Sequence, residues 1–419
     1  MRMKDTLLSP LRRWRDERRL SPAARAERSR DRQGLPEVDP GAEAAVEAAL
    51  GWLGRAQDCS RSGDGGVSRH YSLIDGWAAS YPETTGYIVP TMLEQGEARG
   101  DPEWIRRARR MLDWLVSIQF PEGGFQGGSI GSTPRVPVTF NTGQILLGLA
   151  AGAKRWAVYR QPMERAAEWL VRSQSPDGSW SGHPSPFVKA GAKTYDTHVA
   201  WGLLEAARRT PGSPYAESAL ANVRWALSHQ RGNGWFDSCC LNDPERPLTH
   251  TIGYALRGVL EAYAYDGDPQ LLSRARLTAD ALAGVLERHG RLPGRLDERW
   301  QPAVAWSCLT GSAQIAHCWL LLYAHTGETR YRDAGFAANA LVRRTVSVTG
   351  APDVRGGVKG SFPVDGAYGR YQYLNWAAKF LIDANTLEAT LRRGGSRGAC
   401  PESRGGGESE SPTPRLGSP

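Results

Sequence analysis

The feature that most constrains the fold is a repeated pattern of tryptophan, leucine and glutamine. It occurs at Trp52-Leu53 with Gln57, Trp114-Leu115 with Gln119 and Trp169-Leu170 with Gln174, and in part at Trp225 with Gln230. Glycine and an aromatic residue follow three of these copies, at Gly123-Gly124-Phe125, Asp177-Gly178-Ser179-Trp180 and Gly234-Trp235-Phe236. Apolar residues at helical spacing before a glycine predict a helix that ends in a turn. A period of roughly 55 to 60 residues has room for a helical hairpin and a loop.

The same periodicity predicts twelve helices in six pairs. The first helices of the pairs cover residues 41–57, 102–119, 161–174, 214–230, 269–288 and 330–346. The second helices cover residues 83–99, 140–154, 196–210, 250–266, 311–327 and 370–388. Loops within pairs are long, about 15 to 25 residues, whereas the connections between pairs are short. Because every long loop then lies at the same end, we predict an all-α (α/α)6 toroid with the second helices inside the first.

Composition and charge define the domain limits and exclude several classes of protein. We predict one toroid domain at residues 39–391, between a disordered basic arm (1–38) and a disordered tail rich in Gly, Ser, Arg and Pro (392–419). The 15 Trp, 14 Tyr and 8 Phe exclude disorder for most of the chain. The lack of an apolar run of about 18 residues predicts no integral membrane association. Much of the net charge of +8 lies in the arm and the tail, so we expect no nucleic-acid partner.

The N-terminus and the cysteines predict a cytoplasmic protein. The N-terminal stretch lacks the apolar segment of a secretory signal, and the six cysteines lack CxxC spacing, which favours reduced thiols. We expect neither cofactor nor metal. Asp237-Ser238-Cys239 resembles the start of a zinc site, but it precedes its helix and lacks convergent partners. The oligomeric state is left open.

The long loops and the N-termini of the second helices predict where a site lies, because both would gather at one mouth of the toroid. The catalytic candidates there are titratable side chains, namely Glu83, Asp196, His198, His250 and Tyr368. The candidates for substrate binding are His70, Tyr81, Asn141, Trp306, Arg355, Lys359 and Tyr371. Aromatic rings stack on sugar faces, and Arg355 and Lys359 would suit the carboxylate of a uronate.

The same candidates also have structural interpretations. Glu83 is suitably placed to be a first-turn charge that the helix dipole favours, and Asp196 to be an N-cap. His70 and His250 could be caps or loop histidines with satisfied hydrogen bonds, and His198 could simply pack. The sequence does not choose between these roles and the functional ones.

The Trp-Leu-x-x-x-Gln and Pro-Asp-Gly-Ser-Trp pattern resembles the repeats of squalene and oxidosqualene cyclases and of protein prenyltransferase β subunits, over most of residues 40–390. The six-hairpin count is similar to carbohydrate-active toroids, which include unsaturated glucuronyl hydrolases, acylglucosamine-type epimerases, polysaccharide lyases and uronyl C5-epimerases. The resemblance implies a fold and not a reaction. A cyclase would need an Asp-x-Asp-Asp acid, and Tyr195-Asp196-Thr197 supplies one aspartate only.

We therefore predict a carbohydrate-active enzyme that acts on an acidic, uronate-type sugar or oligosaccharide by epimerisation or elimination. Either reaction needs a base, a neutralised carboxylate and a proton donor. A second possibility is a glycoside hydrolase of the six-hairpin type that uses Glu83 and Asp196 as two opposed carboxyl groups. A third is a toroid like the terpenoid cyclases and prenyltransferases, and a fourth is a toroid that binds a glycan without catalysis.

Overall fold

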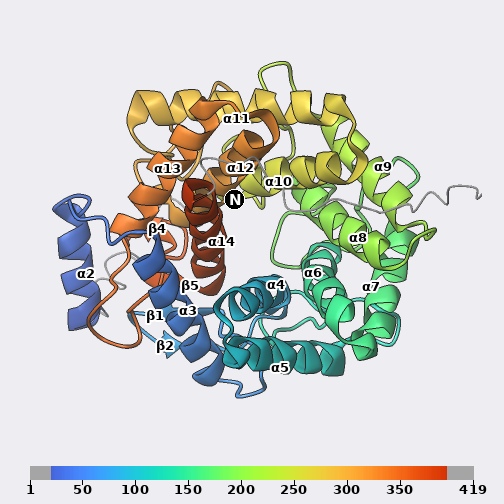
Figure 1. The fold of residues 1–419 in the computed structure, drawn as a ribbon, viewed down its shortest axis with the longest axis horizontal. Coiled ribbons are helices and arrows are strands. Elements are labelled where there is room, and N and C mark those ends of the chain that lie inside the picture. The colour runs from blue at the N-terminus through green and yellow to red at the C-terminus, as the bar shows by residue number, and fades with distance from the viewer. Residues whose placement is uncertain (1–19, 394–419) are drawn as a thin grey trace, which may run out of the picture.

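The computed structural model describes residues 20–393 and confirms a toroid of six helical hairpins (Figure 1). The outer ring contains α3 (Ala42–Asp58), α5 (Pro102–Ile118), α7 (Arg160–Ser173), α9 (Tyr215–Ser228), α11 (Pro269–His289) and α13 (Thr329–Arg344). The inner ring contains α4 (Pro82–Arg99), α6 (Thr139–Arg155), α8 (Thr197–Arg209), α10 (Thr249–Asp266), α12 (Leu309–Thr326) and α14 (Asn375–Arg393). Each inner helix packs on the next, and α14 packs on α4, which closes the ring. Within residues 20–393, none of the helices has the length and apolarity that a bilayer span requires.

The glutamine of the sequence repeat joins consecutive hairpins. Gln119 Nε2 donates to the carbonyl oxygens of Gly123 in the turn and Pro162 on the next outer helix, both at 2.9 Å. Gly123 has a φ of 110°, and a Cβ atom there would lie 2.2 Å from the carbonyl oxygen of Arg165. Only glycine lets the turn press on the following helix in this way. The glutamine and the glycine of the repeat therefore connect one outer helix to the next.

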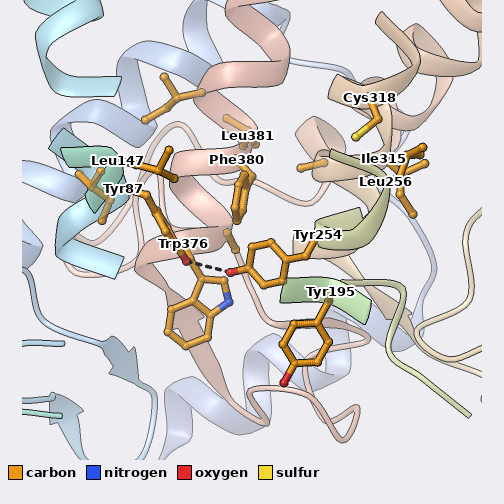
Figure 2. Packing of buried hydrophobic residues seen from close by; sticks show 14 of the residues in the cluster. Tyr87, Leu147, Tyr195, Tyr254, Leu256, Ile315, Cys318, Trp376, Phe380 and Leu381 are labelled. Carbon is orange, nitrogen blue, oxygen red and sulfur yellow. Dashed lines mark hydrogen bonds between the residues drawn. The ribbon is translucent and has the colours of Figure 1, made fainter. Parts of the chain in front are cut away.

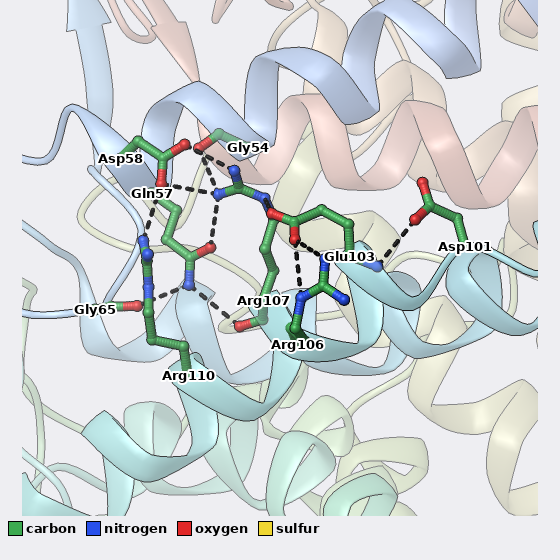
Figure 3. A network of polar contacts seen from close by, with 9 residues as sticks. All are labelled: Gly54, Gln57, Asp58, Gly65, Asp101, Glu103, Arg106, Arg107 and Arg110. Atoms are coloured by element: carbon green, nitrogen blue, oxygen red, sulfur yellow. Dashed lines mark hydrogen bonds and ion pairs between the residues drawn. The ribbon is translucent and has the colours of Figure 1, made fainter.

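A network of charged side chains strengthens the first of these junctions (Figure 3). Gln57 Nε2 donates to the carbonyl oxygen of Gly65 at 2.9 Å, which repeats the pattern at Gln119. Arg107 on α5 donates to both carboxylate oxygens of Asp58 at the end of α3, at 2.9 and 2.8 Å. This bidentate geometry is the strong form of an ion pair, so it holds α3 against α5.

Glycines near the N-termini of the inner helices allow these helices to converge. A Cβ atom on Gly86 of α4 would lie 2.4 Å from the Cα atom of Ile145 on α6. One on Gly311 of α12 would lie 2.6 Å from the backbone nitrogen of His250 on α10. The close convergence predicted from small residues is thus confirmed, and it brings side chains from distant parts of the chain to one mouth of the ring.

Short strands link the loops at this mouth and were not expected from the sequence. One sheet contains β2 (Gly76–Trp77), β1 (His70–Ser72) and β5 (Gln372–Leu374), all antiparallel, and thereby joins the first long loop to the sixth. A second sheet pairs β3 (Ser307–Cys308) with β4 (Ser361–Phe362). The last inner helix consequently starts at Asn375 and not at residue 370, because the residues before it are paired as β5.

The structure corrects part of the predicted disordered arm at residues 1–38. Residues 22–32 form α2 (Pro22–Arg32), which packs beside the sixth loop (Figure 1). Leu20 and Ala24 are buried, and Asp31 accepts a hydrogen bond of 2.7 Å from the backbone nitrogen of Val364. The sequence does not reveal this helix because its charged residues face partners far away in the chain. Residues 1–19 and 394–419, which complete the predicted arm and most of the predicted tail, lie outside the described residues.

Candidate active site

A cavity of about 250 Å³ lies at the mouth of the toroid, where the N-termini of the inner helices meet the long loops. Aromatic side chains form much of its wall, namely Tyr81, Tyr87, Phe140, Trp180, Tyr195, Tyr254, Tyr368 and Trp376. The hydroxyl groups of Tyr87 and Tyr254 are 3.3 Å apart, and Figure 2 shows them joined, with Tyr195 and Trp376 nearby. Rings combined with a few polar groups suit a ligand that has apolar faces and hydroxyl edges, such as a sugar.

Glu83 projects into this cavity from the first turn of α4. Its Oε2 atom accepts a hydrogen bond of 3.1 Å from Asn141 Nδ2 at the start of α6. Burial raises the pKa of Glu83 to about 7, although a hydrogen bond from Tyr81 and the positive charge of Arg69 oppose the rise. A carboxyl group with such a pKa exchanges its proton near neutral pH, which is the property required of a general acid or base.

Asp196 reaches the same cavity from η2 (Thr194–Asp196), the turn that precedes α8. Within the described part of the chain, its carboxyl group makes no capping hydrogen bond to α8, so the simple N-cap role is not what the structure shows. Asp196 is only 5% exposed. Burial raises its pKa to about 8, against the lowering effects of the backbone N–H and the ammonium group of Lys193. Asp196 is therefore mostly protonated at neutral pH.

His250 and Tyr368 complete the group of predicted catalytic residues that line the cavity. His250 Nδ1 is 2.7 Å from Gln314 Oε1, so the proton is on Nδ1 and Nε2 is a hydrogen-bond acceptor. Burial lowers the pKa of His250 to about 4, which keeps the ring neutral at physiological pH. Tyr368 accepts a hydrogen bond of 2.9 Å from Trp376 Nε1, and its ring centroid is 5.6 Å from that of His250.

Two predicted histidines lie outside the cavity. His198 is buried behind the wall, where its Nδ1 atom is 2.6 Å from Gln144 Oε1 and its ring packs against Tyr254. His70 belongs to β1, and its Nδ1 atom is 3.1 Å from the guanidinium group of Arg69. His198 thus occupies a packing position, and His70 contacts Arg69, which lines the cavity.

Four predicted binding residues also lie outside the cavity. They belong to the fifth long loop (residues 290–308) and the sixth (residues 345–374). Trp306 packs on Gly294, where a Cβ atom would lie 2.0 Å from the indole ring. Arg355 is exposed, and its carbonyl oxygen accepts a hydrogen bond from Arg55. Lys359 is buried between carboxylates of α2, and Tyr371 is buried beside the same helix. Neither Arg355 nor Lys359 lines the cavity, because Lys359 pairs with the carboxylates of α2 and Arg355 is exposed elsewhere, so their binding of a uronate carboxylate stays a prediction that this cavity does not support.

The cavity wall contains three side chains that were not among the predicted site residues. Arg69 lies between two rings, with its guanidinium carbon 5.6 Å from the ring centroid of Tyr81 and 5.2 Å from that of Trp376. Lys193 lies just before Asp196 and lines the same wall. Trp376 was missed because the sequence placed the start of the last inner helix five residues too early. Among residues 20–393, no three His, Cys, Asp or Glu side chains are arranged to hold a metal ion.

Comparisons with known proteins agree with the fold. No protein-family model matches the chain, and no curated protein matches it by sequence. The unsaturated glucuronyl hydrolase of Bacillus sp. GL1, described as responsible for the degradation of glycosaminoglycan, matches with a TM-score of 0.65 and 17% identity, over 84% of this chain and 96% of its own. A D-mannose isomerase matches with a TM-score of 0.67 and 11% identity, over 85% and 100%. A sugar epimerase from a ruminal bacterium matches with a TM-score of 0.67 and 10% identity, over 81% and 98%.

The chain has the fold of the six-hairpin toroids. The resemblance to carbohydrate-active toroids that the sequence suggested is thus confirmed for the architecture. At identities this low the likeness concerns the fold alone, so the activity has to be argued from the side chains of the cavity.

Proposed function

We propose that the protein is a carbohydrate-active enzyme that hydrolyses a glycosidic bond in a short saccharide, with Glu83 and Asp196 as the catalytic pair. The observation that carries this proposal is that two carboxyl groups, one partly and one fully buried and with pKa values raised to about 7 and about 8, line one small cavity. Two carboxyl groups that titrate differently can divide the roles of acid and base between them. Structural neighbours that are named as sugar enzymes support the choice of a saccharide substrate.

In this mechanism Asp196 keeps its proton at neutral pH and gives it to the glycosidic oxygen as the bond breaks. Glu83, which loses its proton near pH 7, activates the attacking water or attacks the sugar directly. Asn141 holds the Glu83 carboxylate by its hydrogen bond. The aromatic walls stack on the sugar ring, and neutral His250 accepts a hydrogen bond from a sugar hydroxyl at Nε2.

The charges of the cavity also bear on the other classes of function considered from the sequence. A cavity for a terpenoid would present mainly aromatic side chains, whereas this wall also contains Arg69, Glu83, Lys193 and Asp196. A site for binding alone would need no carboxyl groups with shifted pKa values. Both features favour an enzyme that acts on a polar substrate.

Epimerisation or elimination, which the sequence placed first, is the second candidate. The specific observation in its favour is the neutral His250, whose free Nε2 atom could remove a proton from carbon. Tyr368, whose ring centroid is 5.6 Å from that of His250, would then be the proton donor. Such a reaction exchanges a carbon-bound hydrogen with solvent, and glycoside hydrolysis does not.

The two candidates can be separated in one assay. The purified full chain is incubated in D₂O with neutral and uronate-containing oligosaccharides, and the products are analysed by mass spectrometry and chromatography. We expect release of a smaller sugar without deuterium at carbon, a loss of at least about 100-fold for Asp196→Asn, and no loss for the exposed control Asp333→Asn. Cleavage that survives both Asp196→Asn and Glu83→Gln would refute hydrolysis by this pair. Deuterium at carbon would favour the second candidate.

A further inference from the structure

Lys193 differs in its contacts from two other buried lysines of the described part of the chain. It is 7% exposed and lines the cavity. Among residues 20–393, no group hydrogen-bonds or ion-pairs with its ammonium group. Two other lysines that are equally buried are both paired: Lys359 Nζ lies 2.8 Å from Glu27 and 2.5 Å from Asp31, and Lys379 pairs with Asp383. The side chain of Lys193 is largely buried, whereas its ammonium group opens onto the cavity, so an anionic group of a ligand in the cavity can serve as its charge partner.

The nearby acidic residues do not supply that partner. Asp196 is close enough for its pKa to respond to the charge of Lys193, but burial keeps this carboxyl group mostly protonated at neutral pH. Asp243 in the fourth loop pairs with Arg246, with a nitrogen–oxygen distance of 3.0 Å. The other cation of the wall, Arg69, adds a second positive charge near the opposite carboxyl group, Glu83. The cavity therefore has an excess of positive charge at neutral pH.

The backbone around Lys193 is held in place by contacts between the third and fourth loops. Thr194 is fully buried, and its hydroxyl group donates to the carbonyl oxygen of Asp237 at 2.9 Å. Earlier in the same loop, the backbone nitrogen of Lys189 donates to Asn242 Oδ1 at 2.7 Å. The third and fourth loops thus hold each other, and they present the ammonium group beside Asp196 without the need for reorganisation.

We infer that Lys193 binds the acidic group of the saccharide and places it beside Asp196. The ligand is a sugar that carries one anionic group, either the carboxylate of a hexuronic acid or a sulfate or phosphate ester. This inference rests on the proposed function for the sugar part of the ligand. It also replaces the prediction for Arg355 and Lys359, because the anion is bound from the third loop and not from the sixth.

The test is equilibrium binding, which does not depend on turnover. Glucuronate, glucose 6-sulfate, glucose 6-phosphate and glucose are titrated by calorimetry into the full chain and into Lys193→Met, Lys193→Arg and the control Lys189→Met. Lys189 is an exposed residue of the same loop. We expect at least one anionic sugar to bind the wild type about tenfold or more tightly than glucose, as for a hydrogen bond to a charged group. The strongest of the three identifies the acid.

The variants decide whether Lys193 is responsible. Lys193→Met should remove the preference for the anionic sugar, while Lys193→Arg and Lys189→Met should keep it. If Lys193→Met does not fold, a preference that survives in Lys193→Arg and weakens with added salt still supports a cation at this position. The inference is overturned if the wild type binds glucose as well as every anionic sugar, or if Lys193→Met keeps the preference. Failure of hydrolysis with intact selective binding would refute the proposed reaction and leave this inference standing.

Discussion

Replacing Glu83 with glutamine should make the protein more stable at pH 8, although the change removes a proposed catalytic group. Burial raises the pKa of Glu83 from its ordinary value of 4.5 to about 7. The unfolded chain therefore releases this proton more readily than the folded protein, and the folded state loses stability as pH rises from 4.5 to about 7. At 1.36 kcal/mol per pH unit, the loss amounts to about 3 kcal/mol. Glutamine avoids it, and its oxygen can still accept the hydrogen bond from Asn141.

Thermal unfolding of the wild type and Glu83→Gln at pH 5 and pH 8 measures this effect. For a domain of this size, 3 kcal/mol corresponds to a rise in Tm of roughly 4 °C, expected at pH 8 and nearly absent at pH 5. The matched control is Glu97→Gln on the same helix, whose side chain is 57% exposed and whose effect should stay within about 0.5 kcal/mol at both pH values. If Glu83→Gln raises Tm by the same amount at pH 5 and pH 8, the carboxyl group of Glu83 is not held in its neutral form.

Two further predictions concern the pH dependence of turnover and the ion pair that joins α13 to α14. Turnover should be greatest between about pH 7 and about pH 8, because Glu83 must have lost its proton while Asp196 keeps its own; a rate that does not fall above about pH 9 would contradict the role of Asp196. Arg343→Met should lower the free energy of unfolding by about 3 kcal/mol in a urea titration, because it removes the guanidinium group that joins the buried carboxylate of Glu388, 2.8 Å away, to Asp39, and leaves Glu388 with Arg392 as its remaining charge partner. Arg332→Met on the same helix should cost less than about 0.5 kcal/mol, and equal effects of the two changes would refute this account of the ion pair.

The repeat explains why much of the fold and part of the site could be predicted. Since the hairpins recur at a nearly constant spacing, equivalent positions at the starts of the inner helices must meet at one mouth. This relation correctly predicts from the sequence that Glu83, Asn141, Asp196 and His250 share a common cavity. Their catalytic roles do not follow from it and stay a proposal.

The long loops could not be predicted in the same way. The sixth loop turns Lys359 away from the cavity because its ammonium group pairs with Glu27 and Asp31 of α2, more than 300 residues earlier in the chain. No local pattern signals a contact of that range. Lys193 lies in the third long loop, which was expected at the mouth, but its burial in the cavity wall accompanies packing against the fourth loop that no local pattern signals.

The central claim is that one saccharide lies between the two carboxyl groups at the mouth of the ring. A crystal structure of Asp196→Asn soaked with an oligosaccharide that carries a hexuronic acid tests it most directly. We predict the glycosidic oxygen within hydrogen-bond distance of residue 196, Glu83 at the same sugar ring, and the acidic group on Lys193. A sugar bound elsewhere on the molecule, with this cavity filled only by water, would contradict the account.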